Sequence, residues 1–132
     1  MSDDYARQRR IQDDIGFKTA AFVAGMMHYF SLVFTLNILT NLAGQVKMVL
    51  DMEPSLLRGV FNLPANLMFL PEARRSIMAL AVILAVSGVV FAGLVIYCRL
   101  VFRYGHWTRA LGRVLLHEAF PFTLCLVLDL LT

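Results

Sequence analysis

Two long stretches of the chain are apolar, and neither contains a charged side chain. Residues 19–46 and 76–98 lack Asp, Glu, Lys and Arg and are dominated by Leu, Val, Ala, Phe and Met. A bilayer has a hydrocarbon core ~30 Å thick, which takes ~20 helical residues to cross. At ~1.5 Å of rise per residue, the two stretches reach ~42 Å and ~34 Å as helices. The pattern therefore predicts two membrane-spanning helices.

The same pattern orders the rest of the chain around these spans. It predicts an all-α integral membrane protein, a transmembrane helical hairpin within a single membrane domain, 1–132. In chain order, we expect a polar N-terminal arm (1–17), a first span (18–44), an apolar connector with an interfacial helix (45–71), a second span (72–98), a basic amphipathic helix (99–118) and an apolar, membrane-embedded tail (119–132).

The connector is unusually apolar for a loop and is punctuated by proline. Polar residues recur every four positions between Arg58 and Asn66, with apolar residues elsewhere. This spacing favours a short helix lying in the membrane interface and broken near Pro64. A re-entrant segment is the alternative. Pro71 followed by Glu72 is typical of a helix start, which places the second span directly after it.

The second span carries a stripe of small residues. Its members follow the spacing i, i+4, i+7, i+11 and lie within ~60° of one another on a helix. They are Ala81, Ala85, Gly88 and Ala92. Helices in lipid associate where small side chains let two backbones approach closely. We therefore expect a helix-packing face here, whose partner is the first span, another copy of the chain or another protein.

The first span is less uniform, because polar side chains interrupt it. They are His28, Ser31, Thr35, Asn37 and Asn41. The first three fall on one helix face, and the two asparagines fall on a different one near the far end. Lipid offers no hydrogen-bond partner, so we expect these groups to face protein, water or the interface.

Residues 99–118 have two contrasting faces. One carries His106, Arg109, Arg113 and His117, and the opposite one carries Trp107, Leu111, Val114 and Leu115. A helix of this kind lies well in the headgroup plane. We expect contact with lipid headgroups from Arg99, Arg103, Trp107, Arg109 and Arg113.

The tail after this helix is apolar but short. Residues 119–131 number too few to cross a bilayer alone, although counting from Val114 the stretch is nearly long enough. It is therefore either a third, tight span or a half-embedded segment covered by a partner. Pro121 is expected to kink it. Asp129 must reach water, an interface or a cation of a partner.

Composition agrees with a membrane protein and orients it. Hydrophobic residues make up 59% and charged residues 16% of the chain, against about 45–50% and about 25% in soluble domains. The formal net charge is +3. Because the basic residues flank the apolar runs, we assign them to headgroups and topology rather than to nucleic acid. Eight lie on the side of the N-terminal arm and four in the connector, which predicts the N-terminus inside.

Candidate chemistry is sparse. No catalytic motif and no metal-ligand spacing is present, and Cys98 and Cys125 fit the pattern of buried small hydrophobes. His28 is the one side chain within a span that could hold haem or metal or carry a proton, and a hydrogen-bonded packing histidine is the preferred interpretation. We expect no enzymatic activity, no catalytic residue, no metal and no cofactor. A haem- or quinone-associated anchor is a weaker alternative.

These features lead to an expectation of function. The chain is expected to be a small, non-catalytic structural or assembly subunit of a larger membrane complex, of the respiratory, photosynthetic or secretion and conjugation type. Its expected partners are other membrane subunits or copies of itself and bound phospholipids, with no nucleic acid and no small-molecule substrate. The expected location is a bacterial or organellar inner membrane, with the N-terminus on the cytoplasmic or matrix side. The alternative is a self-assembling, holin-like pore or channel.

Overall fold

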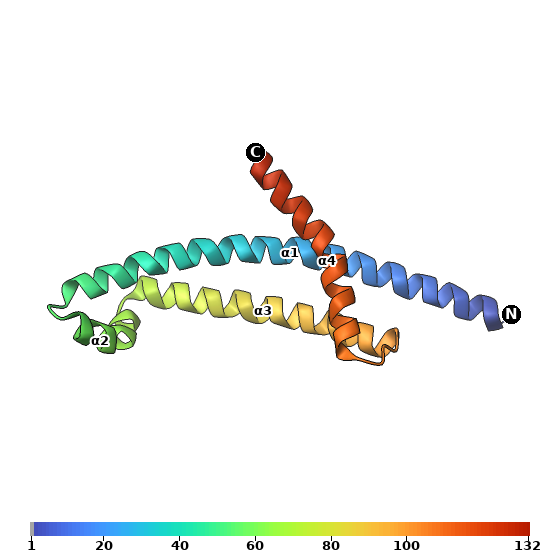
Figure 1. Cartoon of the computed structure of the whole chain (residues 1–132), viewed down its shortest axis with the longest axis horizontal. Coiled ribbons are helices and arrows are strands. Elements are labelled where there is room, and N and C mark those ends of the chain that lie inside the picture. The colour runs from blue at the N-terminus through green and yellow to red at the C-terminus, as the bar shows by residue number, and fades with distance from the viewer. Residues whose placement is uncertain (1) are drawn as a thin grey trace. The chain divides into compact units, whose positions relative to one another are not determined.

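The computed structural model describes residues 2–132 as four helices (Figure 1). They are α1 (Ser2–Met52), α2 (Leu56–Phe69), α3 (Pro71–Val101) and α4 (Trp107–Leu131). No strand occurs among these residues. The all-α fold class expected from the sequence is therefore confirmed.

Three of the four helices are long and apolar enough to cross a membrane: α1, α3 and α4. The first two contain the charge-free stretches. The third joins two segments that the sequence pattern separated, because α4 runs without a break from the basic residues through the apolar tail. Pro121 lies inside α4 and does not end it. The finding is consistent with a membrane protein.

The chain forms two compact units, and α1 and α3 contribute to both. The first unit contains residues up to Phe30 together with Ser87–Thr132, and the second contains Ser31–Val86. The first unit therefore holds the N-terminal part of α1, the C-terminal part of α3 and all of α4. The second holds the remaining parts of α1 and α3, joined by α2.

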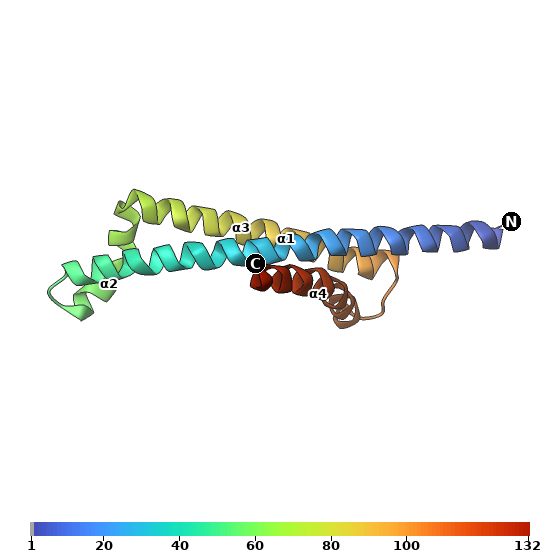
Figure 2. The same cartoon turned by 90° about the horizontal axis from the view of Figure 1, so that it is seen from above.

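The first unit has a small core at the meeting of its three helices. Its fully buried residues are Phe17, Ala21, Cys98, Ala110 and Val114. Aromatic rings close the core, since the ring centroids of Phe17 and Phe102 lie 5.6 Å apart in an edge-to-face arrangement, the geometry that aromatic quadrupoles favour. Within this unit, α4 crosses α1 in Figure 1 and lies against one side of α1 in Figure 2.

A glycine sets the distance at this crossing. A Cβ atom added to Gly25 of α1 would lie 2.5 Å from Pro121 Cγ and 2.6 Å from the Glu118 carbonyl oxygen, both in α4. No side chain larger than hydrogen fits there without moving the helices apart. Ala21 and Ala24 are also buried. Small residues on α1 thus allow two backbones to come close, the mode of association that lipid favours.

In the second unit, α1 and α3 are joined by α2 and pack more loosely. Its buried residues are Val49, Gly59 and Ala73. The break expected near Pro64 is wrong, because α2 continues for five residues beyond it to Phe69. Proline lacks the N–H that would donate one turn back, and α2 nevertheless continues through it. The start of α3 at Pro71 is as predicted.

Candidate functional site

A buried polar contact joins all three helices of the first unit, at His28. Its Nδ1 lies 2.9 Å from Oε2 of Glu118 in α4, and its Nε2 lies 3.2 Å from the backbone carbonyl oxygen of Ser87 in α3. The side chains of His28 and Glu118 are only 15% and 9% exposed. An imidazole and a carboxyl group thus meet within an otherwise apolar crossing.

Glu118 is the buried charged residue of this unit. Its second carboxyl oxygen, Oε1, is buried and has no hydrogen-bond partner within the described chain. A buried polar atom without a partner costs free energy, and a buried charge costs more unless it is paired. His28 is therefore the partner that the described chain gives to the Glu118 carboxyl group, through one of its two oxygens.

The residue after His28, Tyr29, makes another polar contact between α1 and α4. The Tyr29 hydroxyl donates a hydrogen bond to the carboxylate of Asp129. Tyr29 is buried, and its ring packs edge-to-face on Phe122, with centroids 5.5 Å apart. Asp129, which the sequence left in need of water, an interface or a cation, has a tyrosine as its partner.

Arg113 of α4 anchors the other end of the crossing. Its guanidinium donates to Asp14 at 2.5 Å and to the Tyr104 hydroxyl at 2.6 Å. It also lies 4.0 Å from the centroid of the Phe102 ring and 5.0 Å from that of Phe17, within range of a cation–π interaction. The structure thus gives protein partners to a cation that the sequence assigned to headgroups.

Asp14 is held between two cations. Lys18 lies 3.0 Å from it, one helical turn away. The hydrogen bond from Lys18, together with the charges of Lys18 and Arg113, lowers the pKa of the Asp14 carboxyl below its ordinary value of 3.8, against an opposing effect of burial. The carboxylate is therefore charged over the whole physiological range.

The other predicted headgroup residues lie around the turn between α3 and α4. Arg99 donates to the backbone carbonyl of Tyr104 and lies 5.2 Å from the Trp107 ring centroid. Arg103 and Arg109 are exposed, and so is Trp107. Arg103 has a φ of 54°, a left-handed conformation that non-glycine residues adopt at sharp turns. These residues form a local basic and aromatic cluster.

The small-residue stripe of α3 is exposed in the chain. Ala81, Ala85, Gly88 and Ala92 all face outward, and a Cβ added to Gly88 would meet nothing within 4 Å. In the first unit, α3 packs instead through larger side chains, namely Phe91, Leu94, Val95 and Tyr97, around buried Cys98. The stripe has no packing partner within residues 2–132.

The other polar residues expected in the first span belong to the second unit. Ser31 and Thr35 are half-buried, whereas Asn37 and Asn41 are exposed. The structure thus separates them from His28, which lies in the first unit.

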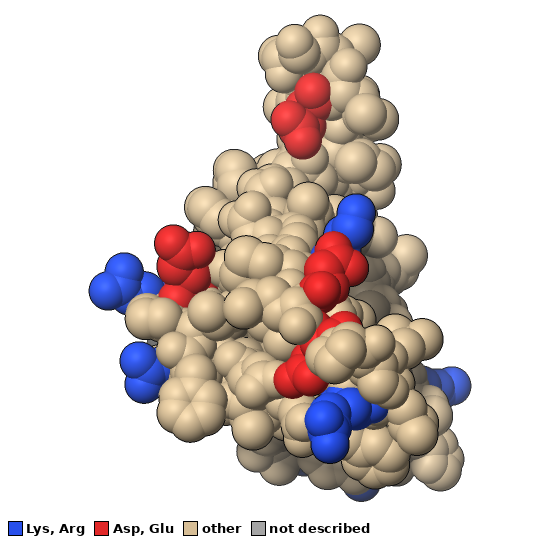
Figure 3. All heavy atoms as spheres, turned by 90° about the vertical axis from the view of Figure 1, so that its left-hand side faces the viewer, with Lys and Arg blue, Asp and Glu red and all other residues tan. Residues whose placement is uncertain are grey.

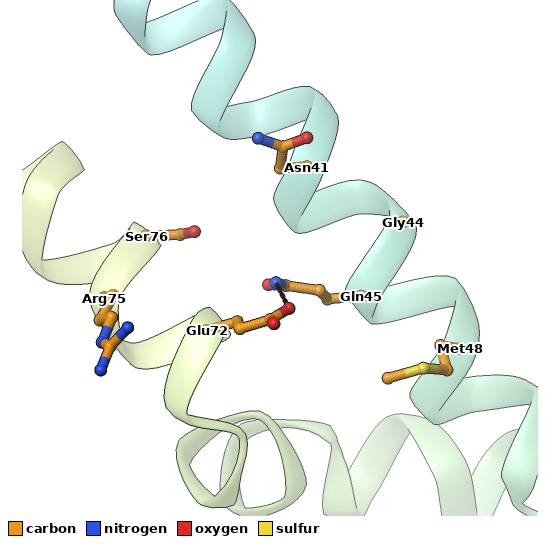
Figure 4. Close-up of a pocket in the computed structure, with 7 residues that line it drawn as sticks. All are labelled: Asn41, Gly44, Gln45, Met48, Glu72, Arg75 and Ser76. Atoms are coloured by element: carbon orange, nitrogen blue, oxygen red, sulfur yellow. Dashed lines mark hydrogen bonds between the residues drawn. The ribbon is translucent and has the colours of Figure 1, made fainter.

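A polar hollow of about 610 Å³ lies in the second unit, between α1 and the start of α3 (Figure 4). Gln45 and Glu72 point toward each other across it, and Gln45 Nε2 donates to Glu72 at 3.5 Å. The Gln45 carbonyl oxygen has no partner in the described chain. Arg75 points away from this pair (Figure 4). The hollow is open and its hydrogen bond is long, so it places no group firmly enough for chemistry.

Glu118 is the residue that the sequence interpretation missed. It lies 90 positions from His28, and no local pattern connects the two. A signal was nevertheless present, because the buried face of α4 follows the helical spacing Ala110, Val114, Glu118, Pro121. This face lies between the two that the sequence suggested, and Trp107, Leu111 and Leu115 are exposed.

The hydrogen bonds of His28 bear on whether this site could hold a cofactor. Both ring nitrogens of His28 already have partners, so ligation of haem or metal would require one of these contacts to break. No group of three or more His, Cys, Asp or Glu that could hold a metal ion occurs within residues 2–132. Comparisons with protein-family models, curated proteins and solved structures gave no match for this chain.

Proposed function

We propose that this chain is a small, non-catalytic structural or assembly subunit of a multi-subunit membrane complex, held in the bilayer by α1, α3 and α4. Support comes from how little of its apolar surface the chain buries itself. None of the residues in the most apolar part of α3 is buried. Exposed apolar surface of this extent requires lipid or other membrane helices. Seen from the side of α2, acidic and basic side chains lie among uncharged ones (Figure 3).

The observation that carries the proposal is the exposed stripe of Ala81, Ala85, Gly88 and Ala92. In lipid, apolar side chains gain little by leaving one apolar environment for another, and close backbone approach at small residues drives association instead. The chain uses this device internally at Gly25. A second set of small residues, left outside, provides the surface on which a helix of another subunit would pack.

The proposed topology is a helical hairpin of α1 and α3 with α4 as a third span. Its 25 residues reach ~37 Å at ~1.5 Å per residue. The N-terminal arm and the turn between α3 and α4 then share the cytoplasmic or matrix side, where Arg99, Arg103, Trp107 and Arg109 meet headgroups. The connector and the C-terminus lie on the opposite side. Exposed Leu57, Phe61 and Phe69 suit α2 to the interface there.

The test is whether a membrane assembly depends on the stripe. Extracted from the native membrane with a mild detergent, the chain of 14.9 kDa should migrate in a native gel well above a monomer in the same detergent. The double variant Ala85→Ile, Gly88→Ile should shift it to the free form. Ala79→Ile, Gly93→Ile is the matched control, because these small residues are exposed on α3 but lie off the stripe. Equal migration of both variants with the parent protein would remove the proposal.

A second candidate is a self-assembling pore, and the exposed amides of Asn37 and Asn41 favour it. An amide facing hydrocarbon lacks a partner, whereas one lining a water-filled path is hydrated. Purified protein in dye-loaded liposomes distinguishes the two functions. Leakage that Asn37→Leu, Asn41→Leu abolishes would support the pore, and intact liposomes with no crosslinked homo-oligomer would rule it out.

A further inference from the structure

The partner of His28 Nε2 fixes the position of one proton. A backbone carbonyl can only accept a hydrogen bond, so the contact of Nε2 with the Ser87 carbonyl at 3.2 Å requires the hydrogen to be on Nε2. The tautomer with hydrogen on Nδ1 alone is therefore incompatible with this contact.

A second proton must then lie between the two side chains. His28 Nδ1 and Glu118 Oε2 are 2.9 Å apart, a hydrogen-bond distance that two acceptors do not adopt. Either the imidazole is doubly protonated beside a carboxylate, or a neutral imidazole accepts from a carboxylic acid. Both arrangements contain the same number of protons, and both leave the pair with no net charge.

Removing this proton would be costly where the pair lies. It would leave one net negative charge in a crossing where Oε1 already lacks a partner, and one bare ring nitrogen, either Nδ1 beside the carboxylate or Nε2 beside the Ser87 carbonyl oxygen. The close approach of α1 and α4 at Gly25, three residues from His28, keeps the two groups together. A deprotonated pair is thus disfavoured as long as the helices stay at this separation.

The neighbouring ionisable groups are engaged elsewhere and do not neutralise such a charge. On α1, Tyr29 bonds to Asp129 of α4. On α4, Arg113 bonds to Asp14, and His117 Nδ1 donates to the Arg113 carbonyl oxygen at 2.9 Å. Cys125 is half-buried on the same helix. The part of α3 that carries Ser87, residues 76–96, has no ionisable side chain.

We propose that His28 and Glu118 form a proton-binding site, in which one proton is held between Nδ1 and Oε2 for as long as α4 stays packed on α1. Release transfers this proton to water, changes the charge of the pair from zero to −1 and separates α4 from Gly25. The inference goes beyond the proposed role as a subunit and holds whichever complex the chain joins.

The test is nitrogen-15 NMR of the full chain in lipid nanodiscs, labelled at histidine, at about pH 8, where an exposed imidazole is neutral. Exposed His106 in the same sample provides that reference. We expect His28, assigned by its loss in His28→Gln, to show hydrogen on Nε2 and a protonated or proton-sharing Nδ1. A bare Nδ1 like that of a neutral imidazole, or a bare Nε2, would overturn the proposal.

Two variants test the origin of this proton. In Glu118→Gln, an amide N–H can donate to Nδ1, so the Nδ1 signal should move to the range of a neutral acceptor, whereas Asp129→Asn should leave it in place. If Glu118→Gln does not fold, the comparison of His28 with His106 in the parent protein still decides. An unchanged Nδ1 signal in folded Glu118→Gln would contradict the proposal.

A glycine pair tests the dependence on packing. Gly25→Ala places a Cβ within 2.6 Å of α4 atoms, and Gly16→Ala, in the same helix, places one with nothing within 4 Å. Gly25→Ala should convert His28 to the proton count of His106, and Gly16→Ala should not. An identical Nδ1 signal in the two variants would show that the proton does not depend on the crossing.

Discussion

The two units of the chain use the same helices, α1 and α3, with very different results. In the first unit, α4 packs on both helices. The side chains that are completely or almost completely inaccessible to solvent there include Phe17, Cys98 and Val114. In the second, the buried residues are Val49, Gly59 and Ala73, and Gln45 makes one long hydrogen bond. Apolar composition is similar in both, so composition does not decide where a core forms.

Residue size and the pairing of polar groups decide where a core forms. The first unit has Ala21, Ala24 and Gly25 on α1 where α4 crosses, and ionisable groups that pair across the helices. Where lipid replaces water, close approach and hydrogen bonding are the main gains of helix association. In the second unit, the small residues Ala81 and Ala85 of α3 are exposed instead. We therefore expect substitutions to have large effects in the first unit and small effects in the second.

The largest contrast should come from two phenylalanines. Phe17→Ala removes a side chain that is 1% exposed and that contacts Arg113 and Phe102, and should lower the free energy of unfolding by about 3 kcal/mol. Phe34→Ala, in the second unit, removes one that is 58% exposed, and should change it by less than about 0.5 kcal/mol. Unfolding by SDS in mixed micelles, followed by circular dichroism, measures both. Equal effects would remove the distinction between the units.

The next largest contrast in the free energy of unfolding should come from two polar pairs, His28 with Glu118 and Gln45 with Glu72. Glu118→Ala leaves His28 facing an apolar gap and should cost about 2 kcal/mol in the same assay, since a buried group loses its partner. Glu72→Ala removes an exposed carboxylate whose bond to Gln45 is 3.5 Å long, and should cost less than about 0.5 kcal/mol. A larger loss for Glu72→Ala would reverse the comparison.

Substitution of Gly44 by alanine should stabilise the chain, whereas the same substitution at Gly25 should force α1 and α4 apart. Gly44 lies inside α1 in the second unit, and an added Cβ would meet nothing within 4 Å. Gly44→Ala should therefore raise the free energy of unfolding by roughly 0.5–1 kcal/mol through helix propensity alone. A loss of stability on this substitution would show that a partner or an unrecognised contact occupies that side of α1.

The smallest expected effect is that of pH on Asp14. Because Lys18 and Arg113 lower the pKa of this carboxyl in the folded state, its contribution is complete above the ordinary value of 3.8 and is lost as the pH falls through the lower folded value. The contacts are partly exposed, so Asp14→Asn should cost about 0.5 kcal/mol at pH 7 and nothing at the acid end. Asp51→Asn, at an exposed site of the second unit, is the control. Parallel pH profiles for Asp14→Asn and the parent protein would contradict this assignment.

The sequence predicted what depends on local pattern. Charge-free stretches gave the two long helices, and Pro71 with Glu72 gave the start of α3. Local signals misled at Pro64, because α2 continues through this proline to Phe69 although proline usually kinks or breaks a helix. The contact of His28 with Glu118 could not be predicted, because it depends on how α4 packs on α1, where Gly25 lets the two helices approach closely.

The central claim is that α1 and α3 cross a membrane. Labelling of single cysteines with an impermeant reagent tests this claim most directly. In a background of Cys98→Ala, Cys125→Ala, one cysteine is placed at Ser2, Ser55 or Thr132 in sealed inner-membrane vesicles of known orientation. We predict that the cysteines at positions 2 and 55 react from opposite sides, and that the one at position 132 reacts from the side of position 55. Labelling of positions 2 and 55 from the same side would contradict the account.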